Sequence, residues 1–392
     1  MRVNVDVQVL CCDQTEYRGI QYYTIDLIKA LVDRGKNEYS VSFFVYDKER
    51  GNRNYVENAL SDVLNKIKIN ECNTFDYRKV INGLRKNDAS EYDGISYEKY
   101  VGVDADLFYF PDGTRLPWNV PVGKTVVTIH DVIPLLGEEL NGLTEDFRLR
   151  FRNSMNYIAS RKDIAIVTDS ISSKNDLVRV VGVDENRIRV IYASFSKDKF
   201  YPDKNMDVLL KYDIDSPYVL YLGALAPHKG VDTLIKAADL INSDVKIVLA
   251  GGKTPEYDVE TAIANSDYKD RFILTGFVSE EEKRVLYSNT EVFVFPSSYE
   301  GFGLPVLEAM ACGAPVITSD VSSLPEVGGE AAIYIKPRDS ENLAREIDRI
   351  VLNPVVRDNL SRRGQEHVRS FSWNMMAEQT ERVFMLKKQV VL

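Results

Sequence analysis

Two glutamates lie on either side of a glycine-containing turn in the stretch YEGFGLPVLEAMACGAPVITSD, residues 299–320. Glu300 precedes Gly301-Phe302-Gly303, and Glu308 lies in a helix predicted to begin near Leu304. The N–H groups and the dipole at a helix start attract an anion such as a diphosphate. Because a diphosphate repels a carboxylate, we expect both glutamates to accept hydrogen bonds from neutral hydroxyls. A ligand with these features is a nucleotide diphosphate sugar.

The same turn has two other interpretations on its residues alone. Gly301-x-Gly303 follows a predicted strand and opens a helix, as a dinucleotide-binding fingerprint does, although Val306 occupies the third glycine position. In the other interpretation, Glu300 is an ordinary turn residue, Glu308 is a solvated helix residue, and neither binds a ligand.

The elements that position this turn alternate between short apolar strands and helices, the pattern of parallel βαβ units. In the first half, strands are predicted at 3–10, 41–46, 107–110, 125–129 and 164–168, and helices at 19–32, 144–160 and 170–181. In the second half, strands are predicted at 218–222, 246–250, 271–274, 291–295 and 315–319, and helices at 231–241, 279–288 and 304–312. Ser170 and the pair Ser279/Glu282 are predicted to cap their helices.

Residues 196–217 interrupt this alternation, because they are charged, contain two prolines and lack strong periodicity. We interpret them as the connection between two domains. The predicted fold class is α/β, with two tandem Rossmann-like, doubly wound domains. Ligands of such sheets bind outside the carboxyl ends of the strands.

Glycines follow several predicted strands of the second half, where backbone amides could approach one ligand closely. These glycines are Gly223, Gly251, Gly252, Gly276, Gly301 and Gly303. For any one of them alone, a tight turn between strand and helix is the simpler explanation.

Composition disfavours several classes of function. The chain has 392 residues, and its 49 basic and 59 acidic residues give a net charge of −10, which disfavours a general nucleic-acid binder. Its four cysteines include no C-x-x-C pair, so no zinc site is expected. MRVNVDVQVL has the pattern of a strand and not of a signal peptide, and no apolar run approaches the roughly 18 residues of a spanning helix. We therefore expect a cytoplasmic protein.

Two D-x-D sequences raise the question of a divalent metal, but neither ends a predicted strand. Asp104-Ala105-Asp106 precedes its strand and Asp213-Ile214-Asp215 lies in the connection, so we interpret both as solvated acids and expect no metal. The segment 145–162 is basic, but its cations spread around the helix. A solvated helix is the favoured interpretation, and peripheral contact with the inner face of a membrane is the alternative.

EGFGLPVLEAMACGAPVITSD closely resembles the E-x7-E motif of the retaining glycosyltransferases of family four, the glycosyl transferases group 1, which have the GT-B fold. Other stretches resemble family motifs in the family's order: RGIQYYTIDLIKAL, TIHDVIPL, YVLYLGALAPHKGVDTLIKA, LAGGK and LTGFVSEEEKRVLYSNTEVFVFPSSYEGFGLP. FSWNMMAEQTERVF resembles the helix that crosses back onto the first domain. The resemblance covers nearly the whole chain and leans towards the mannosyltransferase-like branch.

The resemblance implies a domain organisation and an activity. It places an acceptor-side domain at 1–196, a connector at 197–217, a nucleotide-sugar-binding domain at 218–372, and at 373–392 a helix that packs on the first domain. The implied activity is a metal-independent transfer without a cofactor and with retention of configuration. A hexose of the mannose or rhamnose type moves from a GDP- or UDP-type donor to a hydroxyl of a polysaccharide or lipid-linked glycan, as in lipopolysaccharide synthesis.

Family roles in the second half fall on residues of the turn and of the phosphate segment. Glu300 would hold hydroxyls of the donor sugar, Glu308 would bind the ribose, and Lys229 would balance the diphosphate. The other expected donor contacts are Gly223, Val278 beside the base, and the backbone amides of Phe302, Gly303 and Leu304.

Family roles in the first half fall on two loops. His130 would lie over the donor sugar, with Asp131 as a neighbouring substrate contact, and Gly19 would let the first loop approach the diphosphate or acceptor. Together with Glu300 and Lys229, His130 completes the predicted catalytic residues.

Two regions depart from the family pattern. Ala224 stands where the family often has arginine, and His228 occupies the arginine position of another variant of the motif. We therefore hypothesise that a protonated His228 helps to hold the diphosphate. Gln21 and Tyr22 also differ from the family's first loop.

Two alternatives to transfer stay open. One is another GT-B activity, a nucleotide-sugar epimerase or a phosphorylase, although the sequence identifies no acid/base set around the sugar for an epimerase. The other is a non-catalytic sugar-binding or scaffold subunit. The presence of Lys229, Glu300 and Glu308 counts against a scaffold, and Ala224 counts for it.

Overall fold

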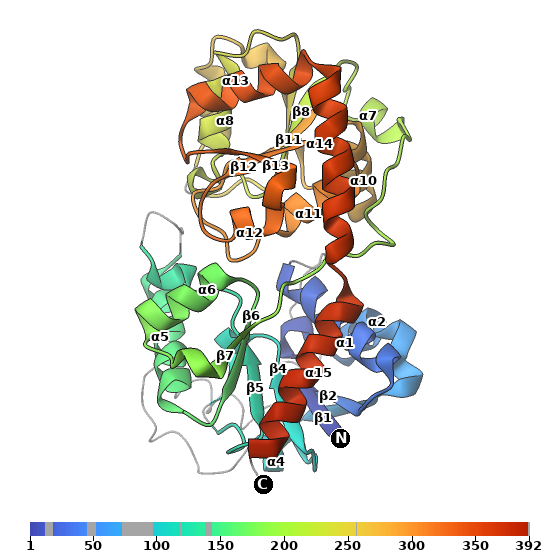
Figure 1. Cartoon of the computed structure of the whole chain (residues 1–392), viewed down its shortest axis with the longest axis vertical. Helices are drawn as coiled ribbons and strands as arrows, with labels where there is room; N and C mark the ends of the chain where they lie inside the picture. Colours follow the sequence, from blue (N-terminus) through green and yellow to red (C-terminus); the bar gives the residue numbers. More distant parts are fainter. Residues whose placement is uncertain are drawn as a thin grey trace. The chain divides into compact units, whose positions relative to one another are not determined.

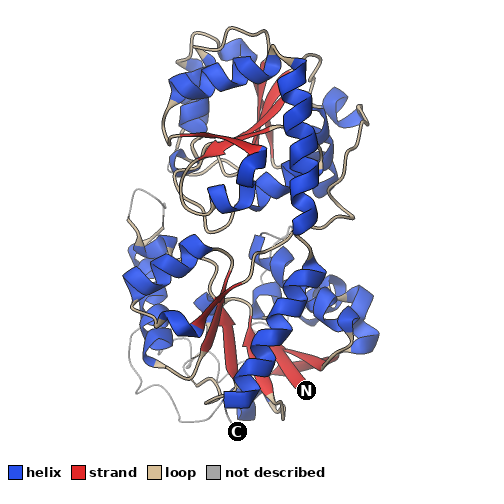
Figure 2. Ribbon diagram, in the orientation of Figure 1, coloured by secondary structure: helices blue, strands red, loops and turns tan. Residues whose placement is uncertain are grey.

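The structure is a computed structural model that describes residues 1–11, 19–44, 52–72, 97–117, 119–137, 143–255 and 257–390. These residues form two compact units (Figure 1). Unit 1 consists of the described parts of Met1–Gly137, Leu143–Ala193 and Ser372–Leu392, and unit 2 contains Ser194–Phe371. Each unit has one parallel sheet with helices around it (Figure 2), which confirms the prediction of two doubly wound α/β domains.

Unit 1 contains a seven-stranded parallel sheet with the order β3-β2-β1-β4-β5-β6-β7. Its strands are β1 (Arg2–Asp6), β2 (Glu38–Phe44), β3 (Lys68–Cys72), β4 (Leu107–Phe110), β5 (Thr125–Thr128), β6 (Ala165–Thr168) and β7 (Ile188–Val190). Every residue of β4 and β5 is buried, as expected for parallel strands covered on both faces. The strand predicted at 3–10 ends at Asp6, because the Asp6 carboxylate accepts the Gln8 N–H at 3.1 Å and starts a turn.

The helices of unit 1 are α1 (Gly19–Arg34), α2 (Asn52–Ala59), α4 (Tyr97–Val101), α5 (Glu145–Ser160), α6 (Ile171–Asp176) and α15 (Trp373–Val390). Two of them, α5 and α6, begin at a capping side chain. Ser170 caps α6 as predicted, since its side chain accepts the Ser173 N–H. After α6, a π-helical segment, η7 (Leu177–Val181), ends at Gly182 in the left-handed conformation.

Unit 2 contains a six-stranded parallel sheet with the order β10-β9-β8-β11-β12-β13. Its strands are β8 (Tyr218–Leu222), β9 (Lys246–Ala250), β10 (Phe272–Gly276), β11 (Val292–Phe295), β12 (Val316–Ser319) and β13 (Ala332–Ile335). β13 lies at the sheet edge, in a region where the sequence predicts no strand. β8 and β11 pair at the centre of the sheet, so the loops that follow them are neighbours.

The helices of unit 2 surround this sheet. They are α7 (Asp207–Lys211), α8 (Val231–Ala238), α9 (Val259–Ala264), α10 (Glu280–Asn289), α11 (Leu304–Ala311), α12 (Leu324–Gly328), α13 (Ser340–Val351) and α14 (Pro354–His367). The predicted capping box of Ser279 and Glu282 is present at the start of α10. The segment 197–217 belongs to unit 2 and contains α7.

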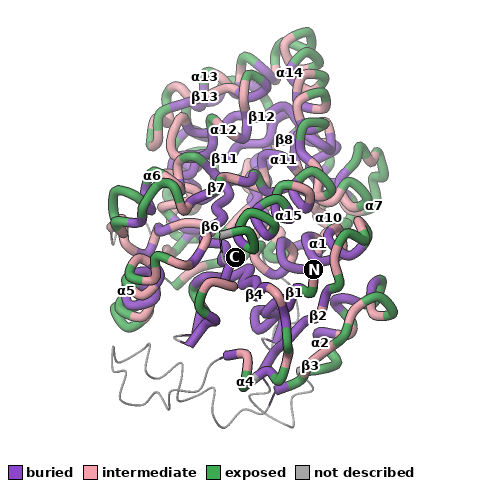
Figure 3. Tube along the Cα trace, turned by 60° about the horizontal axis from the view of Figure 1, so that its bottom comes forward, coloured by how far each residue is buried: buried purple, intermediate pink, exposed green. Residues whose placement is uncertain are grey.

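Helix α15 belongs to unit 1 and packs against α1. Glu381 of α15 is buried and accepts hydrogen bonds from Arg34 at 2.8 Å and from Tyr39 and Asn37 at 3.1 Å each. Figure 3 shows buried strands and exposed residues on the helices, including α15. The last helix is therefore part of the first domain's core packing.

Candidate functional site

The turn that carries the two glutamates joins β11 to α11 in unit 2. The loop after β12 holds it: Ser322 Oγ accepts the Glu300 N–H at 3.0 Å, and Ser323 Oγ donates to the carbonyls of Glu300 and Phe302 at 3.0 and 2.7 Å. Gly303 precedes α11 with φ 111°, a conformation that side chains rarely adopt. Since the first N–H groups of a helix have no acceptor within it, this end of α11 favours an anion.

Two of the predicted catalytic residues, Lys229 and Glu300, form an ion pair in which Nζ lies 2.8 Å from Oε1. They are 71 positions apart in sequence, and the pairing of β8 with β11 brings them together. Their side chains are 24% and 12% exposed, so water reaches the pair only in part. The ammonium group is thereby fixed beside the turn.

Glycines allow the loops around this pair to touch through their backbones. Gly230 has φ 76°, and a Cβ added there would lie 2.1 Å from the carbonyl oxygen of Pro296. Gly251 has φ 144°, and a Cβ there would lie 1.8 Å from the carbonyl oxygen of Gly223. Close packing of three strand-end loops therefore requires these glycines, whether or not a ligand is bound.

Glu308 lies in the second turn of α11 and is partly buried. Tyr287 Oη donates to its Oε2 at 3.3 Å. Burial raises the pKa of Glu308 to about 7; Glu280 adds to the rise, whereas Lys283 and the bond from Tyr287 oppose it. The side chain is thus close to half-protonated at neutral pH, and ribose hydroxyls that donate to it would favour the carboxylate.

We predict that Glu308→Gln stabilises the protein at alkaline pH but not at acidic pH. The folded pKa of Glu308 lies above its ordinary value, so the wild type loses stability as pH rises through about 7. The free energy of unfolding falls by up to about 3 kcal/mol, because the pKa rises from 4.5 to about 7 and each pKa unit corresponds to about 1.4 kcal/mol. The melting temperatures of wild type and Glu308→Gln at pH 5 and pH 8 measure this difference in stability. Glu281→Gln, on the exposed side of α10, is the control. Parallel curves for wild type and Glu308→Gln would contradict the prediction.

The end of β10 carries the residue predicted beside the base. Val278 is 3% exposed, so its side chain belongs to the core and only its backbone could face a base. Phe277 next to it is 56% exposed. Phe277 is not among the residues that the sequence predicts for the site.

His228 lies in the 3₁₀ turn η9 (Pro227–Lys229), next to the lysine of the ion pair. The carbonyl of His228 accepts the Ser298 N–H at 2.9 Å, which joins this turn to the loop after β11. Ala224 is exposed and supplies no charge. The contribution of His228 to diphosphate binding stays a prediction.

In unit 1, His130 follows β5, at the carboxyl edge of the sheet. Its Nδ1 lies 2.5 Å from Asp169 Oδ2, and its Nε2 lies 3.0 Å from the Pro111 carbonyl oxygen. With Asp169 ionised, a carboxylate and a carbonyl face the two ring nitrogens, so both nitrogens donate and the ring is an imidazolium. The Tyr23 ring of α1 meets the imidazole edge-on with 4.6 Å between ring centroids.

The surroundings of His130 keep this charge. Burial alone would lower the pKa of His130, but the carboxylates of Asp169, Asp112 and Asp131 raise it to about 9. The His130 and Asp169 side chains are only 15% and 6% exposed. Sequence analysis missed Asp169, although it directly follows β6, the strand that pairs with β5.

The remaining predicted residues of unit 1 have local structural roles. Asp131 Oδ1 accepts the Ile133 N–H at 2.9 Å and starts the 3₁₀ turn η5 (Ile133–Leu135). Gly19 begins α1 and is exposed, and a Cβ added there would meet nothing within 4 Å. The described residues therefore do not require glycine at this position, and both substrate contacts stay predictions.

The described residues include no group of three or more His, Cys, Asp or Glu side chains that could hold a metal ion. The first D-x-D sequence is engaged elsewhere, since Asp104 and Asp106 pair with Arg2 at 2.9 and 3.8 Å. Within the described ranges, no helix combines the length and the apolar character needed to cross a bilayer.

Comparisons with known proteins relate the chain to one family. Residues 203–367 match the family described as Glycosyl transferases group 1. The chain is 30% identical over 289 residues to O-antigen chain mannosyltransferase B of Escherichia coli, a match that covers 72% of this chain and 74% of that protein. It is 28% identical over 295 residues to the serotype-specific mannosyltransferase WbdA of Escherichia coli, covering 72% of this chain and 34% of that longer protein.

The fold is similar to those of solved structures. Anabaena HepE in complex with UDP and glucose matches with a TM-score of 0.70 and 17% identity, covering 97% of this chain and 98% of that one. Sucrose-phosphate synthase from Thermosynechococcus elongatus matches with a TM-score of 0.70 and 21% identity, covering 98% of both chains. At these identities the likeness concerns the fold alone.

Proposed function

The chain belongs to the glycosyl transferases group 1 and has the GT-B fold, and from this premise we propose that it is a retaining, metal-independent hexosyltransferase. The donor is a GDP- or UDP-type nucleotide sugar, and the acceptor is a hydroxyl of a polysaccharide or lipid-linked glycan. Mannose is the favoured sugar, since two relatives are named mannosyltransferases, and rhamnose is the alternative.

The observation that carries this proposal is the Lys229–Glu300 ion pair beside the start of α11. A diphosphate placed over the turn competes with Glu300 for the ammonium of Lys229. Its binding releases the Glu300 carboxylate, which then accepts hydrogen bonds from hydroxyls of the donor sugar. The ion pair of the unliganded protein thus becomes two separate contacts with the donor.

The same groups stabilise the leaving group. As the bond between the sugar carbon and the diphosphate oxygen breaks, negative charge grows on the diphosphate, where Lys229 and the first amides of α11 attract it. The acceptor hydroxyl attacks from the face that the diphosphate leaves, and a diphosphate oxygen takes its proton. No protein nucleophile is needed, and the sugar keeps its configuration.

We predict that one nucleotide sugar stabilises the protein against heat more than the others. At one hundred times its dissociation constant, a ligand adds about 2.7 kcal/mol to the free energy of unfolding. A thermal-shift panel of GDP-mannose, UDP-glucose, ADP-glucose and dTDP-rhamnose measures the preference, and the preferred donor is then assayed with glycan acceptors. An epimerised sugar formed without an acceptor would favour an epimerase, and no response to any donor would count against the proposal.

We place the reaction in the cytoplasm, at the inner face of a membrane when the acceptor is lipid-linked. Helix α5 is the candidate for peripheral contact, because Arg148, Arg150 and Arg152 accompany Leu149, whose side chain is 48% exposed. Arg150 pairs with Asp146 of the same helix at 2.9 Å, which reduces the charge available for lipids.

A further inference from the structure

A pocket of about 250 Å³ lies in unit 1, at the edge of the sheet where β6 and β7 begin. The segment before β6, the first residues of β7 and the last turns of α15 line it. His130 and Asp169 follow the carboxyl ends of β5 and β6, so the pocket lies at the opposite edge of the sheet from them. It is separate from every residue assigned above to the donor or acceptor.

Four cationic side chains line this pocket: Lys162, Arg187, Arg189 and Lys387. Among the residues that the structure describes, none of the four has a carboxylate oxygen within 4.0 Å. The chain as a whole has more acidic than basic residues and a net charge of −10. A group of four cations without a carboxylate neighbour is therefore not what its composition leads us to expect.

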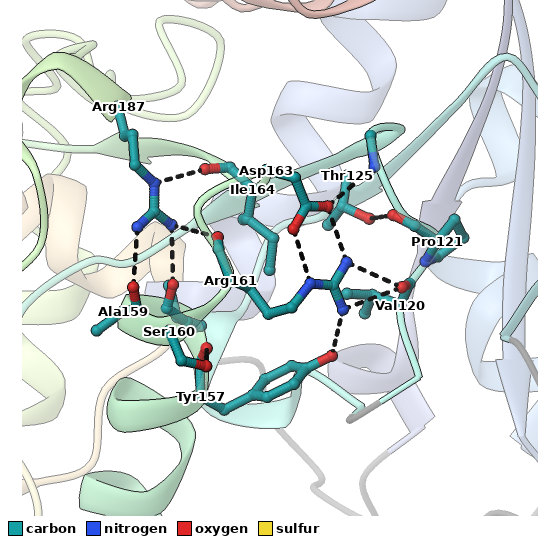
Figure 4. A network of polar contacts seen from close by, with 12 residues as sticks. Val120, Pro121, Thr125, Tyr157, Ala159, Ser160, Arg161, Asp163, Ile164 and Arg187 are labelled. Atoms are coloured by element: carbon teal, nitrogen blue, oxygen red, sulfur yellow. Dashed lines mark hydrogen bonds and ion pairs between the residues drawn. The ribbon is translucent and has the colours of Figure 1, made fainter. Parts of the chain in front are cut away.

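The one acid in the pocket wall, Asp163, is already neutralised from outside the pocket. Arg161 binds it with two hydrogen bonds, Nε to Oδ1 at 2.7 Å and Nη2 to Oδ2 at 2.8 Å, and Gly123 N–H donates to Oδ2 at 2.9 Å (Figure 4). Arg161, with its bonds to the carboxylate, holds the pKa of Asp163 down at about 2. One carboxylate, already paired with Arg161, leaves the four cations of the pocket with an excess of positive charge.

Backbone carbonyls fix Arg187 without cancelling its charge. The guanidinium donates to the carbonyls of Ile158, Ala159, Arg161 and Ile164 at 2.8 to 3.2 Å, close to the end of α5. Figure 4 shows the Arg187 side chain reaching the carbonyls of Ala159, Arg161 and Ile164 beside the Arg161–Asp163 pair. The positive charge of Arg187 is therefore held in one place by carbonyls at the C-terminal end of α5, which offer partial negative charge but no carboxylate.

Lys387 brings a second fixed charge from α15. Its side chain is buried and its ammonium donates to the Asp163 backbone carbonyl. Burial lowers the pKa of Lys387, and Arg187 and Arg161 lower it too, while Asp163 opposes them. Among the residues that the structure describes, the Asp163 carbonyl is the one acceptor found for this three-donor ammonium, and an anion would relieve its repulsion from the guanidinium groups.

We propose that this pocket binds a phosphate-class anion, a phosphate monoester or diester, between Lys387 on the inside and Lys162 and Arg189 at the mouth. A monoester carries about −1.5 to −2 charge and three strong acceptor oxygens, which suits several cations that lack carboxylates. At about 30 Å³ per water, the pocket holds roughly eight waters, enough for a phosphate with a small organic group.

Calorimetric titration of the full chain with inorganic phosphate and with glycerol 3-phosphate tests the site. Both titrations use the Lys229→Ala background, which weakens phosphate binding at the donor turn, and sodium chloride at equal ionic strength is the reference. Adding Lys162→Ala and Arg189→Ala should weaken phosphate binding at least tenfold. Adding Lys36→Ala and Lys68→Ala, which removes equal charge from exposed positions of unit 1, should change it less than twofold.

A conservative pair guards against a folding artefact, since Lys162→Arg with Arg189→Lys should retain binding. Phosphatidylcholine vesicles with and without phosphatidic acid identify the source of the phosphate. Sedimentation with phosphatidic acid that is lost in the alanine pair indicates a lipid headgroup, and saturable binding of glycerol 3-phosphate alone indicates a soluble ester. Absence of both, or equal binding by the alanine pair and its control, overturns the proposal.

Discussion

Lys229→Ala lowers kcat/KM for the donor by about a thousandfold, the largest loss we expect from a single substitution. The lysine is the fixed cation of the turn, and its ammonium lies 2.8 Å from Glu300 in the unliganded protein. Without it, the departing diphosphate keeps only the amides of α11, and Glu300 loses its partner in a largely buried place. Initial rates over a range of donor concentrations separate kcat from KM. We expect most of the loss in kcat, because charge on the leaving group grows in the transition state.

The matched control is Lys253→Ala in the same unit. Lys253 pairs with Glu260 at 2.7 Å, but both side chains are more than half exposed, so this pair contributes little. We expect activity within twofold of wild type. The double variant Lys229→Ala/Glu300→Ala should lose less than the product of the two single losses, since the residues act together. Near-wild-type rates for Lys229→Ala would remove the basis of the proposed function.

Asp169→Asn should reduce kcat by about tenfold to a hundredfold, the range of losses for residues that orient a metal-bound histidine. Asp169 holds His130 as an imidazolium through the 2.5 Å contact at Nδ1. With asparagine there, burial still lowers the pKa of His130, and the main opposing charge is gone. His130 should then lose its proton at a lower pH than the wild-type value of about 9.

The pH dependence of Asp169→Asn distinguishes this role from a purely structural one. The raised pKa of His130 stabilises the wild type below about pH 6.5, and this contribution disappears as pH rises through about 9. The variant should therefore be less stable than wild type at pH 6, and the gap should narrow above pH 9. The chain has three histidines, so nuclear magnetic resonance can follow the titration of His130 directly.

Asp176→Asn is the matched control for Asp169→Asn. Asp176 is also a buried aspartate of unit 1, but it pairs with Arg179 at 2.7 Å and not with His130. We expect activity within threefold of wild type and an unchanged histidine titration. An unchanged His130 pKa in Asp169→Asn would show that other groups fix its charge.

Much of the fold follows from short-range patterns. Buried strands such as LFYF and TVVT are continuous apolar runs, and Ser170 and Ser279 cap helices by local hydrogen bonds. Such features depend on neighbours within a few residues, so the sequence predicts them. The sequence does not predict β13, because its AIYI run is short, lies at a sheet edge and has only two fully buried residues, which leaves little periodic signal.

Which side chains pair with one another at the site depends on the order of the strands in each sheet. The local sequence patterns do not predict that order. Lys229 and Glu300 were each expected at the donor, but their mutual ion pair exists because β8 lies beside β11. Likewise, Asp169 reaches His130 because β6 lies beside β5. A sequence pattern locates the end of each strand, whereas the pairing of side chains across strand ends requires the order of the strands in the sheet.

The placement of α15 in unit 1 has a consequence at the ribosome. Ser194–Phe371 of unit 2 is one continuous stretch of chain, so this domain can fold as soon as the stretch has left the ribosome. The amino-terminal domain must wait for its last helix, which is translated about 200 residues after Ala193, on the order of 10–40 s later at roughly 5–20 residues per second. Until then the α1 surface that α15 covers stays open, which makes the nascent amino-terminal half a natural client for chaperones.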